Sequence, residues 1–506
     1  MDTLPGRIAA VAARAADRVA IEEDGGRSIA YGRFWQQAQG FARALRAHGL
    51  DGGERVAVIL PNRIEAAVAC YAIWLAGGIA VPMNAQARSR ELLPWLRHSG
   101  ASHALFETTH RDAVEAVDRA RRDDLRLQTW ELGPDEPLPD VDGDALPAPM
   151  SDELPALILY TSGTTGAPKG VTLSHRNLLA NAEAVVRYLQ LGEADSVLSV
   201  LGFYYAYGSS VLHTHLLAGA RVVLAQNLLF PHLLMKTTAE RRVTGLSGVP
   251  STFALLLERV TLGDYDLCAL RYLTQAGGPM PPALAARLRA ALPGPRLYVM
   301  YGQTEATSRL TWLPPERLDD KPGSVGIPVD GVELRIVGED GRDVAPGHSG
   351  EVCVRGPNVM LGYWNDTEAT ARVLREGWLH TGDVGRLDED GFLYLDGRRS
   401  DMIKTGAHRV HPKDIEEAVA ELDGVQEAAA IGVDDAILGQ AVRLYVVAPA
   451  LRSGDDGTDI DRIKAHCRRQ LAAYKLPRDV IFVDALPRTA SGKIRRAALN
   501  DLQASQ

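Results

Sequence analysis

The chain has 506 residues, of which 46% are hydrophobic and 24% are charged, and its formal net charge is -9. This is the composition of a globular protein of about three structural units, and it excludes disordered, collagen-like and mini-protein classes. Because nucleic-acid affinity comes largely from clustered Lys and Arg, the acidic balance argues against nucleic acid as a partner.

The spacing of the cysteines and the length of the apolar segments indicate the cellular compartment of the protein. The four cysteines lie far apart and form no CxxC pair, so neither a disulfide framework nor a thiolate zinc site is indicated. Arg14, Asp17 and Arg18 interrupt the alanine-rich N-terminal stretch, which therefore lacks the apolar region of a signal peptide. No window approaches about 18 uncharged apolar residues, so no membrane span is predicted. We expect a cytoplasmic protein.

In the first half of the chain, helical patterns alternate with short apolar runs, as in FWQQAQGFARALRAHGL before RVAVIL. This alternation predicts βαβ units and a parallel sheet covered by helices. From 323 to 395 the pattern changes to short β-rich pieces separated by Gly, Pro and Asp, which indicates an antiparallel sheet or small barrel. After Arg398, helical and strand patterns return in a length sufficient for a small α+β unit.

These patterns predict an α/β protein with a large N-terminal domain and a small C-terminal domain. Residues 1–397 would form the large domain of helix-covered sheets, including a β-barrel-like subdomain at about 323–397. Residues 398–506 would form the small α+β domain. The stretch 133–155, rich in Pro and Asp, is expected to be a surface connection.

The most informative segment is the loop YTSGTTGAPKG at 160–170, which follows the apolar run ALIL. Small residues let backbone N–H groups approach an anion, hydroxyl groups can donate to phosphate oxygens, and Lys169 adds a positive charge. The loop is not a Walker A motif, because Lys169 is followed by Gly170 instead of Ser or Thr. The sequence therefore predicts a phosphate cradle.

This loop resembles the signature of the adenylate-forming superfamily, which includes acyl-CoA synthetases, luciferases and the adenylation domains of peptide synthetases. The resemblance covers essentially the whole chain. Further motifs follow in the family's order and at about its spacing: AGG at 276–278, YGQTE at 301–305, LHTGD at 379–383, GR at 397–398 and PRTASGK at 487–493. The resemblance implies that a carboxylate is joined to the α-phosphate of ATP with release of pyrophosphate, a reaction that depends on positioning and electrostatics.

The resemblance also implies the residues of the nucleotide site. Lys493, Thr304 and Glu305 are the expected catalytic residues: Lys493 acts at the carboxylate, Thr304 contacts the α-phosphate, and Glu305 binds Mg²⁺, which prefers one or two carboxylates with phosphate oxygens. The other ATP-binding residues are, for the β and γ phosphates, Thr161, Ser162, Gly163, Thr164, Thr165, Gly166 and Lys169; for adenine, Ala276, Gly277, Gly278 and Tyr301; and for the ribose or phosphate, Asp383 and Arg398.

In this superfamily the small C-terminal domain is mobile: it rotates after adenylation and replaces the lysine loop with a loop that shapes a thiol tunnel. The resemblance places the hinge at Ser400, where most relatives carry Asp or Lys, and it leaves Asp401 as the alternative pivot. The tunnel would be lined by Lys404, Gly406 and His408, with Gly406 leaving room for a pantetheine arm.

The acyl pocket is expected around 202–210 and includes Tyr204, Tyr205, Tyr207 and Gly208. Amino-acid-activating relatives use an Asp to pair with the substrate's ammonium group. Gly208 stands at the matching position and cannot pair, and a buried unpaired ammonium is unfavourable by several kcal/mol. We therefore expect an uncharged acyl tail, belonging to a medium-length aliphatic acid or an aromatic acid.

The predicted function is that of an ATP- and Mg²⁺-dependent acid–thiol ligase of the acyl-CoA synthetase type, with coenzyme A as the acceptor. Two alternatives stay open: a ligase that loads the phosphopantetheine thiol of an acyl carrier protein, and a non-catalytic nucleotide-binding relative. The presence of Lys493, Glu305 and Asp383 argues against the second alternative. The sequence leaves the acid, the acceptor thiol and the oligomeric state open.

Overall fold

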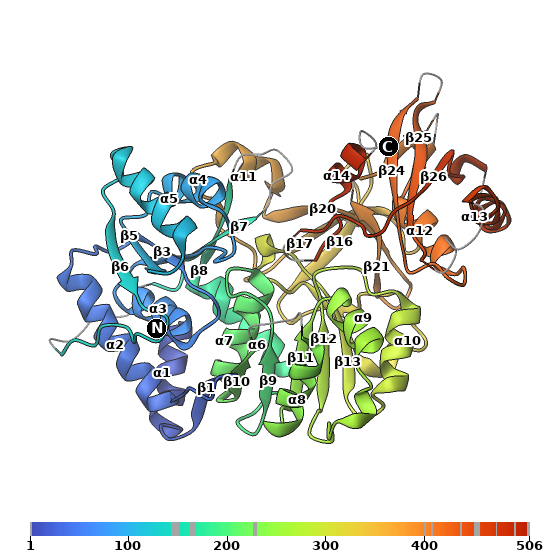
Figure 1. Ribbon diagram of the computed structural model, residues 1–506. Coiled ribbons are helices and arrows are strands. Elements are labelled where there is room, and N and C mark those ends of the chain that lie inside the picture. Colours follow the sequence, from blue (N-terminus) through green and yellow to red (C-terminus); the bar gives the residue numbers. More distant parts are fainter. Residues whose placement is uncertain are drawn as a thin grey trace.

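The protein is mixed α/β, with a large N-terminal part and a smaller C-terminal part that stands beside it at the upper right of Figure 1, so the predicted fold class is confirmed. The structure is a computed structural model. It describes residues 3–142, 151–161, 168–225, 230–398, 401–405, 408–435, 438–449, 456–471, 473–489 and 492–502.

One sheet of the large part has the strand order β15, β14, β13, β12, β11, β9, β10, β1, β2. The strands from β13 to β1 in this order pair in parallel, whereas the strands at both edges pair antiparallel, which is the arrangement expected of βαβ units. The strands are β1 (Val19–Glu23), β2 (Ser28–Ala30), β9 (Ser196–Ser199), β10 (Arg221–Leu224), β11 (Gly245–Gly248), β12 (Tyr272–Gln275), β13 (Arg296–Tyr301), β14 (Thr311–Leu313) and β15 (Ile327–Pro328).

A second sheet has the order β18, β8, β7, β4, β3, β5, β6. It is parallel from β7 to β6, and it ends in the antiparallel strands β8 and β18. The strands are β3 (Arg55–Ile59), β4 (Ile79–Pro82), β5 (His103–Glu107), β6 (Gln128–Leu132), β7 (Pro155–Thr161), β8 (Lys169–Ser174) and β18 (Gly362–Tyr363).

Helices join these two sheets into one core. In α3 (Ile64–Leu75) every residue from Ile64 to Trp74 is buried, as expected of a helix that is apolar on all sides. The same core cluster includes residues of both sheets and of α7 (Ala206–Ala218). The other helices of this part are α1 (Leu4–Arg14), α2 (Tyr31–Ala47), α4 (Ser89–Ser99), α5 (Arg111–Arg122), α6 (His175–Leu189), α8 (Pro231–Glu240), α9 (Pro250–Arg259) and α10 (Pro282–Ala291), with the 3₁₀ turns η1 (Leu262–Asp264), η2 (Thr304–Ala306) and η3 (Pro315–Arg317).

The β-rich stretch that follows forms an antiparallel sheet in the order β16, β17, β20, β19, with β21 also paired to β20. Its elements are β16 (Glu333–Val337), β17 (Gly350–Arg355), α11 (Thr367–Val373), β19 (Leu374–Arg375), β20 (Trp378–Leu387) and β21 (Leu393–Arg398). The predicted domain boundary at 397/398 falls at the end of β21 and stays a prediction.

The C-terminal part has its own sheet, in the order β23, β22, β25, β24, with β26 parallel to β25. Separate apolar clusters form its core. Its elements are β22 (Ile403–Thr405), β23 (His408–Val410), α12 (Pro412–Ala420), β24 (Glu427–Asp435), β25 (Gly439–Val447), α13 (Asp456–Gln470), η4 (Ala473–Lys475), β26 (Asp479–Phe482) and α14 (Arg496–Asp501).

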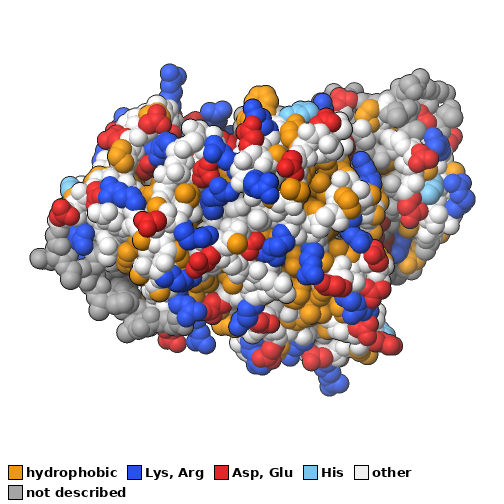
Figure 2. Space-filling view, turned by 90° about the horizontal axis from the view of Figure 1, so that it is seen from below, with side chains coloured by type: hydrophobic (Ala, Val, Ile, Leu, Met, Phe, Trp, Pro, Cys, Tyr) orange, Lys and Arg blue, Asp and Glu red, His pale blue; other side chains and the backbone are white. Residues whose placement is uncertain are grey.

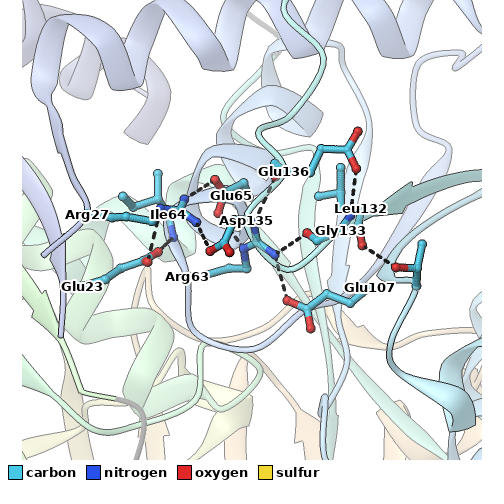
Figure 3. Close-up of polar contacts among 11 residues, drawn as sticks. Glu23, Arg27, Arg63, Ile64, Glu65, Glu107, Leu132, Gly133, Asp135 and Glu136 are labelled. Carbon is cyan, nitrogen blue, oxygen red and sulfur yellow. Dashed lines mark hydrogen bonds and ion pairs between the residues drawn. The ribbon is translucent and has the colours of Figure 1, made fainter. Parts of the chain in front are cut away.

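A buried ionic network fixes the start of α3 (Figure 3). The Arg63 guanidinium donates to Glu65 at 2.6 Å and to Glu107 at 2.8 Å, and it also binds the carbonyl oxygens of Gly133 and Glu136. Arg63 is only 2% exposed, so these partners replace the water that the charge has lost. The network thereby attaches residues after β6 to the core.

Two further features concern the charges on the surface and the length of the helices. On the face shown in Figure 2, Lys and Arg side chains are interspersed with Asp and Glu side chains. Among the described helices, none combines the length and the apolar character needed to cross a membrane.

Candidate active site

The predicted phosphate loop joins two antiparallel strands. Thr161 at the end of β7 lies opposite Lys169 at the start of β8, so the loop closes a hairpin. The helix α6 begins directly after β8, with a capping box between Ser174 and Asn177. Five of the predicted phosphate-binding residues lie outside the described residues, namely Ser162, Gly163, Thr164, Thr165 and Gly166.

Lys169 and Glu305 meet through a residue that the sequence analysis did not select, Tyr363. The Lys169 ammonium lies 5.6 Å from the centre of the Tyr363 ring, and the Tyr363 hydroxyl donates to Glu305 Oε1 at 2.9 Å. Desolvation and the neighbouring Glu305 carboxylate raise the pKa of Tyr363, so its hydroxyl stays protonated and can donate. The antiparallel pairing of β18 with β8 creates this contact.

A second polar group surrounds Asp383 on β20. The buried Tyr301 hydroxyl donates to Asp383 Oδ2 at 2.6 Å, and Arg398 Nε lies 3.1 Å from Asp383 Oδ1. Desolvation and the negative charge of Asp383 raise the pKa of Tyr301. Asp383, Glu305 and Tyr301 all act to raise the pKa of Arg398, Asp383 most strongly, which places the four groups in one electrostatic environment.

The segment 276–278 follows β12 and is held by close backbone packing. Gly277 has φ +86, a conformation that favours glycine, and a Cβ added there would lie 3.3 Å from Val249 Cγ1. Gln275 Nε2 donates to the Gly278 carbonyl oxygen at 2.8 Å. The two glycines of this segment therefore lie close to Val249 and Pro250 at the start of α9.

Lys493 of the C-terminal part lies near these groups of the large part. A Cβ added to the neighbouring Gly492 would lie 3.1 Å from Ser251 Oγ, next to the start of α9. The Lys493 side chain keeps contact with solvent, yet desolvation and the Arg398 charge lower its pKa, while Asp383 and Glu305 act in the opposite direction. The Lys493 loop therefore sits over the site built by Glu305, Asp383 and Arg398.

Comparison with known proteins identifies this arrangement. The family model "AMP-binding enzyme" matches residues 8–364, and "AMP-binding enzyme C-terminal domain" matches residues 414–493. The chain belongs to the AMP-binding enzyme family. The family predicted from the sequence motifs is thereby confirmed.

Individual relatives of this AMP-binding enzyme cover nearly its whole length. It is 35% identical to a feruloyl-CoA synthase of Amycolatopsis sp, over 95% of both chains. It is 35% identical to a long-chain-fatty-acid–CoA ligase of Salmonella typhimurium, over 94% of this chain and 90% of the other. The structure of an o-succinylbenzoate CoA synthetase from Bacillus subtilis, in complex with the acyl-adenylate intermediate OSB-AMP, matches with a TM-score of 0.88 at 30% identity over 99% of both chains.

These matches establish the protein as an enzyme: an AMP-forming acid–thiol ligase of the acyl-CoA synthetase type. The predicted activity is thus confirmed at the level of the reaction class. The non-catalytic alternative is set aside.

In this AMP-binding enzyme the expected acyl-pocket tyrosines differ in their surroundings. The rings of Tyr204 and Tyr205 lie 4.6 Å apart just before α7 and are half-buried. Tyr207 is buried, and its hydroxyl donates to the Thr274 carbonyl oxygen at 2.8 Å. A Cβ added to Gly208 would lie 2.2 Å from the Gly202 carbonyl oxygen, so close packing alone requires glycine there.

A cavity lies between the phosphate-loop strands, α6 and α7. Its polar lining residues are Asn181, Ser209, Ser210, His213 and Thr307, and its apolar walls include leucines of β7 and β8. Burial lowers the pKa of His213 to about 3, so this imidazole stays neutral. In this structure the cavity has room for about one water molecule.

The predicted hinge and thiol tunnel are only partly described. Ser400 and Gly406 lie outside the described residues, and for Lys404 and His408 the structure describes the backbone, in β22 and β23. Asp401, the alternative pivot, donates its backbone N–H to the Arg398 carbonyl oxygen at 3.1 Å.

The structure adds two residues to those predicted: Tyr363 and Arg309. Tyr363 is the second residue of the two-residue strand β18, and Arg309 follows the YGQTE motif by four residues. Neither position carries a sequence pattern of its own. Their contacts arise only from the pairing of β18 with β8 and from the turn after η2.

Proposed function

We propose that this enzyme forms an acyl-AMP from ATP and a carboxylic acid and then transfers the acyl group to the thiol of coenzyme A. The observation that carries the proposal is the position of Lys493 beside Asp383, Arg398 and Glu305. A lysine of the C-terminal part that lies beside these groups of the large part supports the adenylation half-reaction, because a cation there would stabilise negative charge.

The nucleotide would be bound by groups from the three sheets of the large part. The loop 161–169, with Thr161 and Lys169 at its ends, is proposed to bind the β and γ phosphates. The adenine would lie on Ala276, Gly277 and Gly278 beside Tyr301, because glycines permit close approach and an aromatic ring can stack. Asp383 would accept hydrogen bonds from the ribose hydroxyls, with Arg398 fixing its carboxylate.

Glu305 is the proposed Mg²⁺ ligand. Tyr363 lies between the Glu305 carboxylate and the Lys169 ammonium, since it contacts both. Carboxylates together with phosphate oxygens are the ligands that Mg²⁺ prefers. Bound Mg²⁺ would reduce the negative charge of the triphosphate. Tyr363 would keep the Glu305 carboxylate oriented, and Thr304 on the same turn would contact the α-phosphate.

Lys493 would stabilise the negative charge that develops as the carboxylate oxygen attacks the α-phosphate. A preorganised cation placed where charge develops contributes strongly, because it needs no reorganisation during the reaction. The second half-reaction would follow a rotation of the C-terminal domain about Ser400 or Asp401. That rotation would present Lys404, Gly406 and His408 to the thiol. The phosphopantetheine thiol of a carrier protein is the alternative acceptor.

The acid is proposed to be a medium-length aliphatic or an aromatic acid. Aromatic and aliphatic acids are both represented among the relatives, since one is a feruloyl-CoA synthase and another a long-chain-fatty-acid–CoA ligase. Tyr204 and Tyr205 could flank a chain or stack on a ring. Close packing leaves Gly208 no room for the carboxylate that an α-amino acid would need.

The test is to separate the two half-reactions with Lys493→Ala. This variant should reduce acid-dependent ATP–pyrophosphate exchange by roughly 10²- to 10³-fold, the usual effect of removing one electrostatic group from a reacting centre. Transfer from supplied acyl-AMP to coenzyme A should persist. Lys464→Ala is the matched control and should retain both reactions, because this lysine of α13 donates to the Arg478 carbonyl oxygen. Equal loss of both half-reactions in Lys493→Ala contradicts the proposed division.

A further inference from the structure

Arg309 is the largest fully buried side chain among the described residues, with 2% of its surface exposed. Its guanidinium lies 4.1 Å from the centre of the Tyr207 ring, and Arg309 Nε donates to Met300 Sδ at 3.3 Å. Further hydrogen bonds join Arg309 to the Ser308 hydroxyl and to the Tyr188 side chain. All of these partners are neutral, and within the described part of the chain no carboxylate forms an ion pair with Arg309.

A buried cation surrounded by neutral groups is energetically unusual. Removing a guanidinium from water is unfavourable by several kcal/mol, and cation–π contact compensates only part of this. An aliphatic residue would fill the same space without that penalty. The buried charge therefore favours a negative partner, and the described residues do not supply one.

The backbone before Arg309 is shaped to direct this side chain inward. Thr307 and Ser308 have φ of +55 and +99, values that are uncommon for residues other than glycine. A Cβ added to Gly302 would lie 1.8 Å from the Ser308 carbonyl oxygen, so the turn closes only over glycine. Strained turns of this kind persist where the surrounding structure enforces them, and they cluster at functional sites.

The position of Arg309 relates it to the acid and not to the nucleotide. Its main-chain carbonyl oxygen accepts from Asn181 Nδ2, which lines the cavity below the phosphate loop together with Thr307. Its guanidinium lies on Tyr207, the residue after the cavity-lining Ala206 at the start of α7. Glu305, four residues earlier in the chain, belongs to the nucleotide site. Arg309 therefore lies beside residues that line this cavity, Asn181 on α6 and the start of α7.

We propose that Arg309 binds a second carboxylate of the acid substrate, so that the enzyme activates one end of a dicarboxylic acid while the guanidinium holds the other end. This inference rests on the proposed function, and it replaces the expected uncharged acyl tail by an anionic one. A guanidinium pairs with a carboxylate through two parallel hydrogen bonds, and a dry site strengthens the attraction.

The test compares acids of equal length that differ only in the distal group: hexanoate with adipate, octanoate with suberate, and 4-methylbenzoate with terephthalate. Acid-dependent pyrophosphate release is measured for each pair in the unmodified enzyme, in Arg309→Met, in Arg309→Lys and in Arg335→Met. The last variant is the control, since it removes an arginine stacked on Trp378 in a different sheet.

In the unmodified enzyme and the control, kcat/KM should favour at least one diacid over its monoacid. Arg309→Met should lower that ratio by roughly 30-fold or more, the usual effect of truncating one partner of a buried charge pair. Arg309→Lys should retain part of the preference. The rise in melting temperature that the preferred diacid gives should also disappear in Arg309→Met, which is a readout independent of turnover.

Three outcomes overturn the proposal: the unmodified enzyme prefers every monoacid, the ratio is unchanged in folded Arg309→Met, or the diacid stabilises that variant as much as the unmodified enzyme. If Arg309→Met fails to fold, the preference of the unmodified enzyme and the Arg309→Lys ratio still decide. Failure of the proposed function looks different, because then no acid of either kind would support pyrophosphate release.

Discussion

Arg63 and Arg309 are each 2% exposed, yet the protein surrounds their guanidinium groups with opposite chemistry. Arg63 contacts the carboxylates of Glu65 and Glu107 and two carbonyl oxygens (Figure 3). Arg309 contacts an aromatic ring, a thioether and a hydroxyl. A charge neutralised within the chain holds the fold together, whereas a charge left with neutral neighbours marks a place where a ligand can supply the opposite charge.

Glu305 resembles Arg309 in lacking an ion-pair partner among the described residues, but its charge is negative. Its carboxylate accepts a hydrogen bond from the neutral Tyr363 hydroxyl, and among the described residues it forms no ion pair. Its proposed partners are Mg²⁺ and, through it, the triphosphate. The proposed acid and nucleotide sites would thus each contain a charge, Arg309 or Glu305, that has no ion-pair partner among the described residues, at either end of the turn that follows β13.

The largest expected effect is on the free energy of unfolding, and it tests the comparison of Arg63 with Arg309. Arg63→Met should lower the free energy of unfolding by roughly 3–5 kcal/mol, because it leaves two carboxylates near the core without their shared cation. Arg309→Met should change it by less than about 1 kcal/mol in the ligand-free enzyme, since no carboxylate loses its partner. Chemical denaturation of both variants provides the measurement. Similar destabilisation of the two would show that Arg309 is a structural group like Arg63.

The sequence predicts the architecture well where periodicity and ordered motifs carry the information. The alternation of helices and apolar runs led to the two largely parallel sheets, and the motifs around Glu305, Asp383 and Lys493 led to residues that the structure brings into one electrostatic environment. Both signals are local, or are matched one motif at a time. These predictions therefore do not require knowledge of which distant segments are in contact.

The contacts that the sequence does not reveal all depend on tertiary pairing. Tyr363 reaches Glu305 because β18 joins the edge of β8, and Arg309 is buried because the turn after η2 folds inward. Gly208 shows a related limit. From the sequence, Gly208 indicates only that no carboxylate is present to pair with a substrate ammonium group. The structure shows that two carbonyl oxygens exclude any side chain at that position.

An intermediate effect on stability is expected for Gly208→Ala. This variant tests whether the shape of the pocket or the charge of Arg309 controls the diacid preference. An added methyl group would lie 2.2 Å and 2.6 Å from the carbonyl oxygens of Gly202 and Leu201, which belong to the backbone and cannot rotate away. Gly208→Ala should therefore displace the start of α7 and lower stability by about 1–3 kcal/mol.

The Tyr207 ring would move with the helix, so the variant should use monoacids and diacids less well by the same factor. Gly192→Ala is the control, because an added Cβ there has no heavy atom within 4 Å. Thermal unfolding and the diacid-to-monoacid ratio of kcat/KM are the measurements. A change in that ratio as large as in Arg309→Met would mean that pocket shape, and not the Arg309 charge, controls the preference.

The smallest expected effect is at Tyr363, where a neutral group assists an uncompensated charge. Tyr363→Phe removes the hydroxyl that donates to Glu305 Oε1 but keeps the ring beneath the Lys169 ammonium. The lost hydrogen bond should weaken binding by about 1 kcal/mol, or roughly fivefold in the KM for ATP at limiting Mg²⁺. Saturating Mg²⁺ should restore much of the activity, because the ion itself would then orient the carboxylate. The control is Tyr394→Phe on β21, where the ring packs under Arg386 of β20, and it should leave the Mg²⁺ dependence unchanged. If Tyr363→Phe loses activity equally at every Mg²⁺ concentration, the hydroxyl acts on the fold of the site and not on the charge of Glu305, and the parallel between Glu305 and Arg309 fails on the nucleotide side.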